Sequence, residues 1–284
     1  MAYQFKSIEE FLQASYSDRQ LVSFVDDQVY EAKLLAEENE KSSKGFEDYA
    51  KIFVDSWTES FIAISQFSSG LLKGGSEMIQ SYLEARKKGV QANLIPKSWV
   101  AQLKLPPGHP RESVLYAGHP ADPKTYIPIA AFHRFTFEHK FSELVSILMH
   151  LGAKKILVEY VRGWGSKLAA SLSAGIPAAQ VGASAGAEKK KDKTGKILYN
   201  VELSGTDSPS IPDNLVWYPH ESTWQMVAEG RLSFGLKNFS LQLEYQDDYG
   251  VNAGLKMNAE KVGFDVGGEF ERHEATTWSI SGSF

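Results

Sequence analysis

The spacing between apolar residues changes along this chain, and that change constrains the fold more than any other feature. In the first third, apolar side chains recur every three or four residues, whereas in the last third they alternate with polar ones. The first spacing matches the turn of a helix, and the second matches the two-residue repeat of a strand. We therefore expect an α+β fold, in which a helical N-terminal third precedes a mostly antiparallel β-sheet domain with one or two packed helices.

Start signals and periodicity indicate several helices in the first third. Ser7 with Glu10, and Ser17 with Gln20, match the capping box that satisfies free backbone N–H groups at a helix start. The apolar residues from Leu21 to Leu35 are then spaced as on one face of an amphipathic helix. A later helix is expected to carry an aromatic stripe, formed by Tyr49, Phe53, Trp57 and Phe61. This stripe is a candidate partner-binding surface, and packing within a helical core is the alternative.

A stretch rich in Pro and Gly separates the helical part from the rest of the chain. Its composition favours turns, so we predict a helical domain over 1–95, a connector over 96–110 and an α+β domain over 111–284. In the last of these, Phe141 to Leu151 is typical of a helix, and "KKILVEYV" after it is typical of a strand. If "FHRFTF" is also a strand, the three form a β-helix-β unit, although a helix fits that short segment as well.

The C-terminal part shows the alternation of half-buried strands. Four segments carry apolar residues at every second position, around 239–245, 251–257, 264–270 and 278–284. Turn-forming residues such as "QDDYG" separate them. The pattern predicts a C-terminal meander of four antiparallel strands.

A run without charged residues extends from Leu168 to Ala187, and a cluster of lysines follows it. Apolar residues alternate with small polar ones on both sides of a Pro-containing turn, and each side is about as long as a strand that crosses a bilayer. This predicts an amphipathic β-hairpin that contacts membrane through Leu168, Ala170, Leu172, Ile176 and Val181. Its basic flank comprises Lys189, Lys190, Lys191 and Lys193. The alternatives are a hairpin that stays in solution, where small residues let another layer approach, and an Ala/Gly/Ser loop.

Histidines are the main candidates for chemistry, because the chain contains no cysteine. His133 and His139 share one face if their segment is extended, and His220 with Glu221 lies among aromatic residues. Neither set matches a known ligand spacing, so no metal or cofactor is predicted. For each residue, a packed or surface side chain is the alternative to a catalytic one.

Composition and the N-terminus narrow the function further. The net charge of −5 does not support nucleic-acid binding. The first residues lack the basic start and apolar run of a signal peptide, so we expect a cytoplasmic location, with membrane association on activation. The twisted sheet with amphipathic hairpins is similar in architecture to gasdermin-like and perforin-like pore-forming proteins, although the sequence carries no motif of either family.

The leading hypothesis is a non-enzymatic effector or binding protein whose hairpin engages membrane lipid, under regulation by the helical part or by proteolysis. One alternative is an enzyme or small-ligand-binding domain with a pocket lined by His and Trp residues. A second is an assembly subunit that binds protein partners through its aromatic stripe. Self-association into a homo-oligomer is compatible with all three hypotheses.

Overall fold

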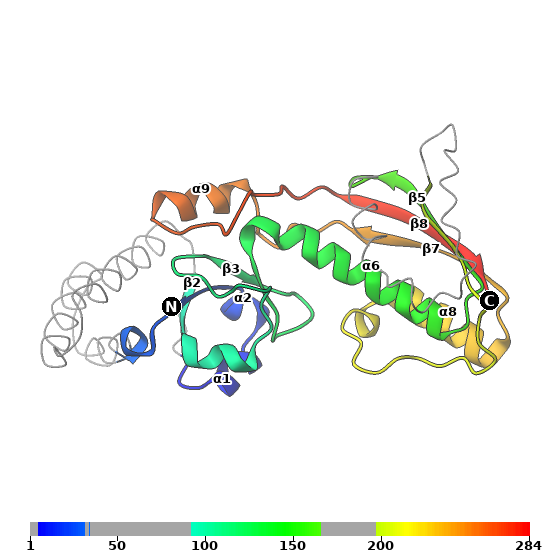
Figure 1. Ribbon diagram of the computed structural model, residues 1–284, viewed down its shortest axis with the longest axis horizontal. Coiled ribbons are helices and arrows are strands. Elements are labelled where there is room, and N and C mark those ends of the chain that lie inside the picture. Colours follow the sequence, from blue (N-terminus) through cyan, green and yellow to red (C-terminus); the bar gives the residue numbers. More distant parts are fainter. Residues whose placement is uncertain (1–4, 32–33, 35–91, 166–196) are drawn as a thin grey trace, which may run out of the picture. The chain divides into compact units, whose positions relative to one another are not determined.

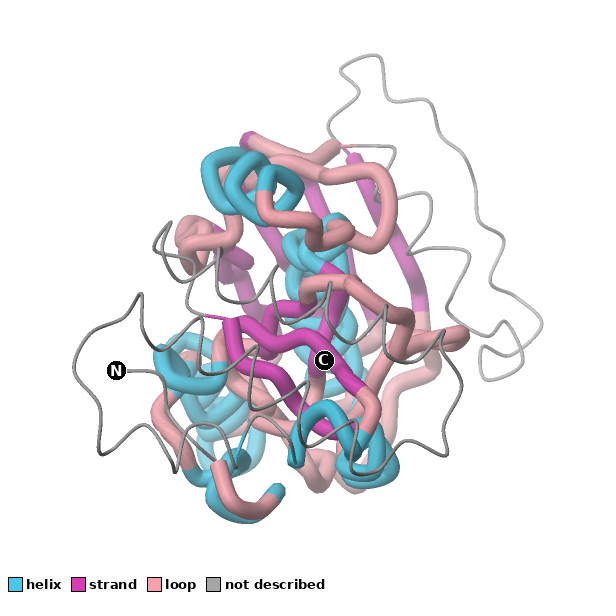
Figure 2. Tube along the Cα trace, turned by 90° about the vertical axis from the view of Figure 1, so that its left-hand side faces the viewer, coloured by secondary structure: helices cyan, strands magenta, loops and turns pink. Residues whose placement is uncertain are grey.

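The computed structural model describes residues 5–31, 34, 92–165 and 197–284, which belong to two compact units (Figure 1). Unit 1 comprises Met1–His133 and Tyr249–Arg272, and unit 2 comprises Arg134–Asp248 and His273–Phe284. Figure 2 shows helices and strands together in the described residues. Each unit contains a four-stranded sheet and helices, and all pairs of described strands but one are antiparallel. The predicted α+β class is therefore confirmed for the described residues.

The sheet of unit 1 has the strand order β2-β1-β3-β4. Its strands are β1 (Leu21–Val25), β2 (Ala92–Pro96), β3 (Tyr116–Gly118) and β4 (Tyr126–Pro128). β1 is parallel to β2 and antiparallel to β3, and β3 is antiparallel to β4. The parallel pair places the N-terminal strand β1 beside a strand that follows almost seventy residues later.

Strand β1 corrects the helix that the sequence predicts from Leu21 onward. All five of its residues are buried. Leu21 and Val25 belong to one apolar cluster, and Val22 and Phe24 belong to a second. A strand covered on both faces has a nearly continuous apolar run. Such a run also matches the spacing of a helix, so the helix predicted from periodicity is wrong here.

Short helices cover the sheet of unit 1. They are α1 (Ile8–Gln13), α2 (Tyr16–Arg19), a helical segment at 27–31, the 3-10 helices η1 (Lys97–Gln102) and η2 (Ile129–Ala131), and α9 (Ala253–Lys261). The Ser7 hydroxyl accepts the Glu10 N–H at 3.2 Å, which confirms the predicted cap of α1. The second predicted cap is wrong by two residues, because Ser15 rather than Ser17 caps α2.

The sheet of unit 2 has the order β6-β5-β8-β7, and every pair in it is antiparallel. Its strands are β5 (Lys155–Arg162), β6 (Ile197–Glu202), β7 (Asn238–Tyr245) and β8 (Thr276–Ser283). The long helix α6 (Phe132–His150), η4 (Tyr218–His220) and α8 (Ser222–Phe234) accompany it (Figure 1). Helix α6 packs on the sheet through Phe137, whose ring meets that of Trp278 at a centroid distance of 4.8 Å.

The structure confirms part of the expected order of elements in the second half of the chain. The predicted helix from Phe141 to Leu151 matches the second half of α6, which ends one residue earlier at His150, and most of "KKILVEYV" lies in β5. The "FHRFTF" segment is not a strand but the first turns of α6, so the predicted β-helix-β unit is wrong. The "FHRFTF" segment and the predicted helix that follows it belong to one long helix.

The predicted four-strand meander is also corrected. Strands β7 and β8 confirm two of its four segments, and they pair directly with each other. Between them, 253–261 forms α9, because the Asn252 side chain accepts the N–H groups of Gly254 and Leu255 and caps a helix there. The segment 264–270 contains only an isolated bridge, between Val114 and Asp265.

Candidate functional site at the base of the β5–β6 pair

The charge-free run of the sequence connects two neighbouring strands of unit 2. Strand β5 ends at Arg162 and β6 begins at Ile197, and the two strands pair antiparallel with Glu159 opposite Ile197. Among the described strands, β6 forms an edge of the sheet. We call residues 159–164 together with Ile197 the hairpin base. The chain leaves and re-enters the described structure at this one end of a strand pair.

Apolar side chains are exposed at the hairpin base. Val161 is 51% exposed and Ile197 is 39% exposed. The burial pattern of β5 explains the first, because the strand is buried at Ile156 and Val158 but opens to solvent over its last residues. Exposed apolar side chains at the edge of a sheet are available for contact with another apolar surface.

Trp164 fixes the chain directly after β5. Its carbonyl oxygen accepts the indole N–H of Trp278 at 2.7 Å, and its backbone N–H donates to the Thr276 hydroxyl at 3.1 Å. Its ring also stacks on Tyr245 at a centroid distance of 5.8 Å. Gly163 permits this approach, because a Cβ there would lie 2.3 Å from the Thr276 hydroxyl oxygen. The last described residues before the charge-free run are therefore firmly attached to β7 and β8.

Three predicted sets of residues lie outside the described part of the chain. The first is the membrane-contact set Leu168, Ala170, Leu172, Ile176 and Val181. The second is the basic flank of Lys189, Lys190, Lys191 and Lys193. The third is the aromatic stripe of Tyr49, Phe53, Trp57 and Phe61. Their roles stay predictions.

His133 and His139 both lie on helix α6, so the extended arrangement that would place them on one face does not form. Six residues of helix place their side chains about 120° apart around the axis. His133 is fully buried in unit 1, where its Nε2 atom donates to the carbonyl oxygen of Val251 at 2.5 Å. His139 is partly buried in unit 2. The contact of His133 is a structural one, because it ties the start of α6 to the segment that leads into α9.

His220 and Glu221 lie at the end of η4 and have different surroundings. His220 is exposed, whereas Glu221 forms an ion pair with the buried ammonium of Lys140 at 2.5 Å. The Lys140 ammonium also donates to the Glu244 carbonyl oxygen at 2.9 Å and lies 5.2 Å from the centre of the Trp217 ring. Lys140 therefore joins η4, α6 and β7 at one point in unit 2.

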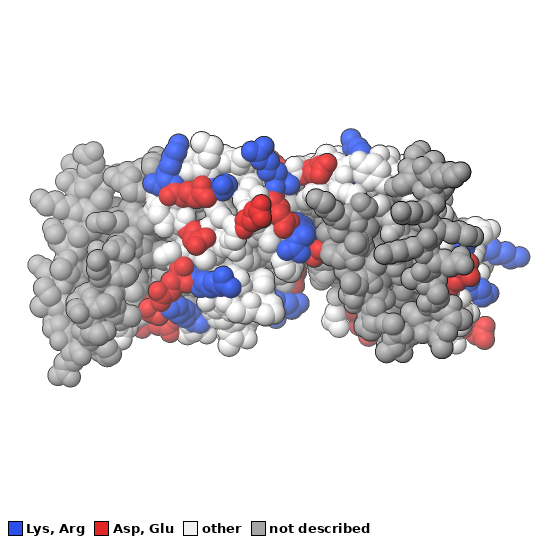
Figure 3. Space-filling view, turned by 45° about the horizontal axis from the view of Figure 1, so that its top comes forward, with Lys and Arg blue, Asp and Glu red and all other residues white. Residues whose placement is uncertain are grey.

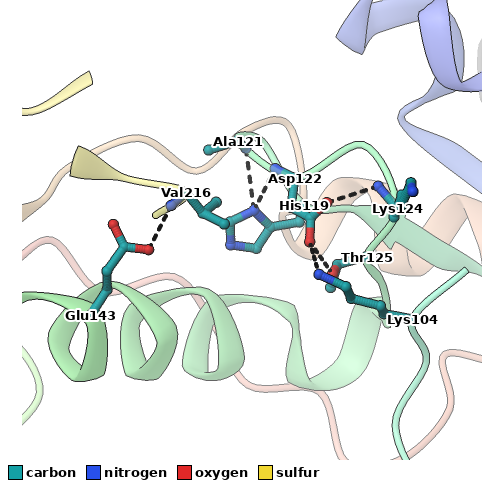
Figure 4. A network of polar contacts seen from close by, with 8 residues as sticks. All are labelled: Lys104, His119, Ala121, Asp122, Lys124, Thr125, Glu143 and Val216. Carbon is teal, nitrogen blue, oxygen red and sulfur yellow. Dashed lines mark hydrogen bonds and ion pairs between the residues drawn. The ribbon is translucent and has the colours of Figure 1, made fainter. Parts of the chain in front are cut away.

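Glu143 makes the densest set of polar contacts in this part of unit 2. Its carboxylate accepts three backbone N–H groups, those of Val216 at 2.7 Å and of Trp217 and Tyr218 at 2.8 Å each. Figure 4 shows the bond to Val216. A carboxylate with three backbone donors is well satisfied in its charged form even when it is buried. Glu143 holds the loop before η4 against α6, which is a structural task.

A second polar network lies in unit 1, on the loop between β3 and β4 (Figure 4). The Nδ1 atom of buried His119 accepts the N–H groups of Ala121 and Asp122, so this histidine is neutral with its proton on Nε2. Burial raises the pKa of Asp122, but bonds from Thr125, the Lys124 N–H and Lys104 outweigh it and hold that pKa below its usual value. This His-Asp pair shapes a turn.

Sequence reasoning missed both Trp164 and Glu143 as organising residues. A signal for Trp164 exists, because a tryptophan between two glycines at the end of a strand favours a tight, packed turn. No local signal marks Glu143, because its three donors lie more than seventy residues away in the sequence.

The described residues contain no group of three or more His, Asp or Glu side chains placed to hold a metal ion. No helix within the described ranges is long and apolar enough to cross a bilayer. On the face shown in Figure 3, acidic and basic side chains lie intermixed. Comparisons with family models, with curated proteins and with solved structures find no match for this chain.

Proposed function

We propose that this protein is a non-enzymatic effector that engages membrane lipid through unit 2, by way of residues 166–196 and the hairpin base that carries them. One observation supports the proposal above the others. Both ends of this segment are attached to one antiparallel strand pair, at a point where Val161 and Ile197 expose apolar side chains. A segment held this way can extend from the protein without disturbing the sheet behind it.

The sequence of the segment supports the same function. Its apolar residues alternate with small polar ones, and the lysines near its C-terminal end favour anionic lipid by about 1 kcal/mol for each cation near the surface. The attachment of Trp164 to β7 and β8 provides a rigid support on the protein side. We propose a cytoplasmic protein that becomes membrane-associated on activation.

Dye release from anionic vesicles tests this function. Intact protein and protein cleaved by limited proteolysis are compared with two variants, Leu172→Asp within the segment and Val161→Asp at the hairpin base. Met257→Asp is the matched control, because Met257 is also an exposed apolar residue, at 53%, but lies on α9 in unit 1.

We expect the cleaved or intact wild type to release dye, Leu172→Asp to abolish release and Val161→Asp to weaken it, with Met257→Asp unchanged. Near-ultraviolet circular dichroism verifies that each variant folds. If neither form of the wild type binds or permeabilises the vesicles, the membrane function is wrong. If Met257→Asp is as inactive as Leu172→Asp, the effect does not arise from this segment.

A further inference from the structure

Strand β7 forms one edge of the sheet in unit 2. Among the described strands it pairs with β8 alone, and this pairing is regular over eight residue pairs, without a register shift. One side of its backbone therefore faces no other described strand. Natural proteins usually protect such an edge with charged side chains, a proline or a bulge, because an open edge is a template for another strand.

The hydrogen bonds of the sheet identify which backbone groups of β7 point away from β8. Directly before β7, the Lys237 carbonyl oxygen accepts the N–H of Phe284 at 2.9 Å. Residues that bond to the neighbouring strand alternate with residues that do not along an antiparallel pair. Counted from Lys237, the odd-numbered residues of β7 bond to β8, and the even-numbered residues direct their N–H and C=O groups to the open side.

The chain itself closes one end of this open side. The buried Lys140 ammonium donates to the carbonyl oxygen of Glu244 at 2.9 Å, which agrees with the outward direction of that even-numbered residue. The other even-numbered residues are Asn238, Ser240 and Gln242. In the described part of the chain, no hydrogen bond occupies the open side of their backbone.

The open part of the edge has none of the usual protection. Its sequence over 238–242 is NFSLQ, which contains neither a charged residue nor a proline. The helix α8 leads into this segment, and its last residue, Phe234, is 79% exposed. An uncharged open edge that follows exposed apolar surface is typical of a site where another chain adds a strand.

We propose that the protein forms a symmetric dimer in which β7 pairs antiparallel with β7 of a second copy. A two-fold axis that uses all three open residues places the middle one, Ser240, opposite its own copy. Asn238 then lies opposite Gln242, so that amide meets amide, and Phe239 lies opposite Leu241 on the apolar face. This self-complementarity favours a second copy over an unrelated strand.

The dimer joins the two four-stranded sheets of unit 2 into one continuous sheet, and no charged residue meets its own copy in the paired segment. It uses no residue of the hairpin base. The proposed dimer is therefore independent of the membrane function, and either can be wrong without the other.

Sedimentation velocity of the full chain, from micromolar to nearly millimolar concentration, tests the dimer. Ser240→Pro removes the outward N–H of each copy, and proline is compatible with this position because Ser240 donates no hydrogen bond to β8. Ser240→Ala keeps the backbone groups and is the matched control. Near-ultraviolet circular dichroism verifies that both variants fold.

A single introduced cysteine tests the register, because the chain has no cysteine of its own. Opposite residues of a hydrogen-bonded antiparallel pair have Cα atoms about 5.5 Å apart, which suits a disulfide. Ser240→Cys should therefore give a disulfide-linked dimer on mild oxidation. Gln242→Cys is the control, because Gln242 lies opposite Asn238 and too far from its own copy to be bridged.

We expect the wild type and Ser240→Ala to dimerise equally well. Ser240→Pro should raise the dissociation constant at least about tenfold, because two hydrogen bonds across the interface are lost. A wild type that stays monomeric at every concentration refutes the dimer. The proposal is also overturned if folded Ser240→Pro dimerises as tightly as the wild type, or if Gln242→Cys cross-links as fully as Ser240→Cys.

Discussion

The carboxylate of Glu143 accepts the backbone N–H of Trp217 at 2.8 Å, across more than seventy residues of sequence. The same oxygen accepts the N–H of Tyr218, and the other oxygen accepts that of Val216. One helix residue thereby satisfies three consecutive backbone donors at the start of η4. The path of the chain into η4 depends on this single side chain.

Replacing Glu143 tests that dependence. Glu143→Ala leaves the three donors without their acceptor, so we expect the free energy of unfolding to fall by about 3 kcal/mol. Glu143→Gln keeps one acceptor oxygen and should lose only about 1 kcal/mol. Urea unfolding followed by tryptophan fluorescence measures both. The exposed Glu229 on α8 provides the control, since Glu229→Ala should change stability by less than about 0.5 kcal/mol.

Gly163 lies in the turn that positions Trp164, and Gly235, at the end of α8, is the matched control. Both have a positive φ, of 84° and 66°, but a Cβ at Gly163 would lie 2.5 Å from Thr276 Cα, whereas a Cβ at Gly235 meets nothing within 4 Å. Gly163→Ala should therefore lower the free energy of unfolding by about 3 kcal/mol, and Gly235→Ala by about 1 kcal/mol. Equal losses in denaturant titrations would show that the close approach to Thr276 does not matter.

The pair of His109 and Tyr116 predicts a pH dependence in unit 1. The Tyr116 hydroxyl accepts the Arg111 N–H at 2.8 Å, so it donates its own proton to His109 Nδ1, 2.7 Å away. This bond requires neutral His109, and burial followed by the charge of Arg111 lowers the pKa of that imidazole. Below pH 6.5 the unfolded chain then binds a proton more readily than the folded one, so stability falls as the pH falls.

Urea unfolding at a series of pH values from about 7.5 to about 5, the range in which imidazole titrates, measures how the free energy of unfolding depends on pH. His109→Gln removes the titrating group, and we expect its stability to depend less steeply on pH than that of the wild type. A direct NMR titration of His109 should give a midpoint below that of a free histidine. A midpoint above that value would contradict the assigned hydrogen-bond direction.

Arg19 predicts an unusual gain in stability. Arg19→Met replaces a buried cation, whose Nη1 atom has no hydrogen-bond partner among the described residues, by an apolar side chain of similar length. We expect the free energy of unfolding to rise by roughly 1 kcal/mol, because the desolvation penalty disappears. Arg272→Met removes an exposed cation and is the control, with little change expected. A loss of more than about 2 kcal/mol in Arg19→Met would mean that the cation is satisfied in the folded protein.

The sequence predicts a strand most clearly where one face of the strand is exposed to solvent. Strand β7 alternates strictly between exposed and buried residues, so its two-residue repeat is visible without any knowledge of its neighbours. In β8, Trp278 and Ile280 are buried, whereas Ser279 and Ser281 are only partly buried. Here the hydrophobic pattern records the fold directly.

The wrong predictions arise where burial on both faces removes the alternation of apolar and polar residues, or where a capping residue starts a helix inside an alternating pattern. Strand β1 is buried on both faces and therefore has no alternation. In 251–257, alternate apolar residues imitate a strand, whereas the capping side chain of Asn252 begins α9. The candidate site could be predicted only in part, because the pairing of β5 with β6 and the contacts of Trp164 join residues distant in sequence.

Each unit is assembled from two separated stretches of chain, and this determines when it can form during synthesis. Unit 1 needs Tyr249–Arg272, and unit 2 needs His273–Phe284, which supplies the strand between β5 and β7. A ribosome releases the chain from its N-terminus, so neither core can close until the C-terminal residues have emerged. A chain stalled before that point exposes two unfinished cores at once, which makes it a natural client for chaperones.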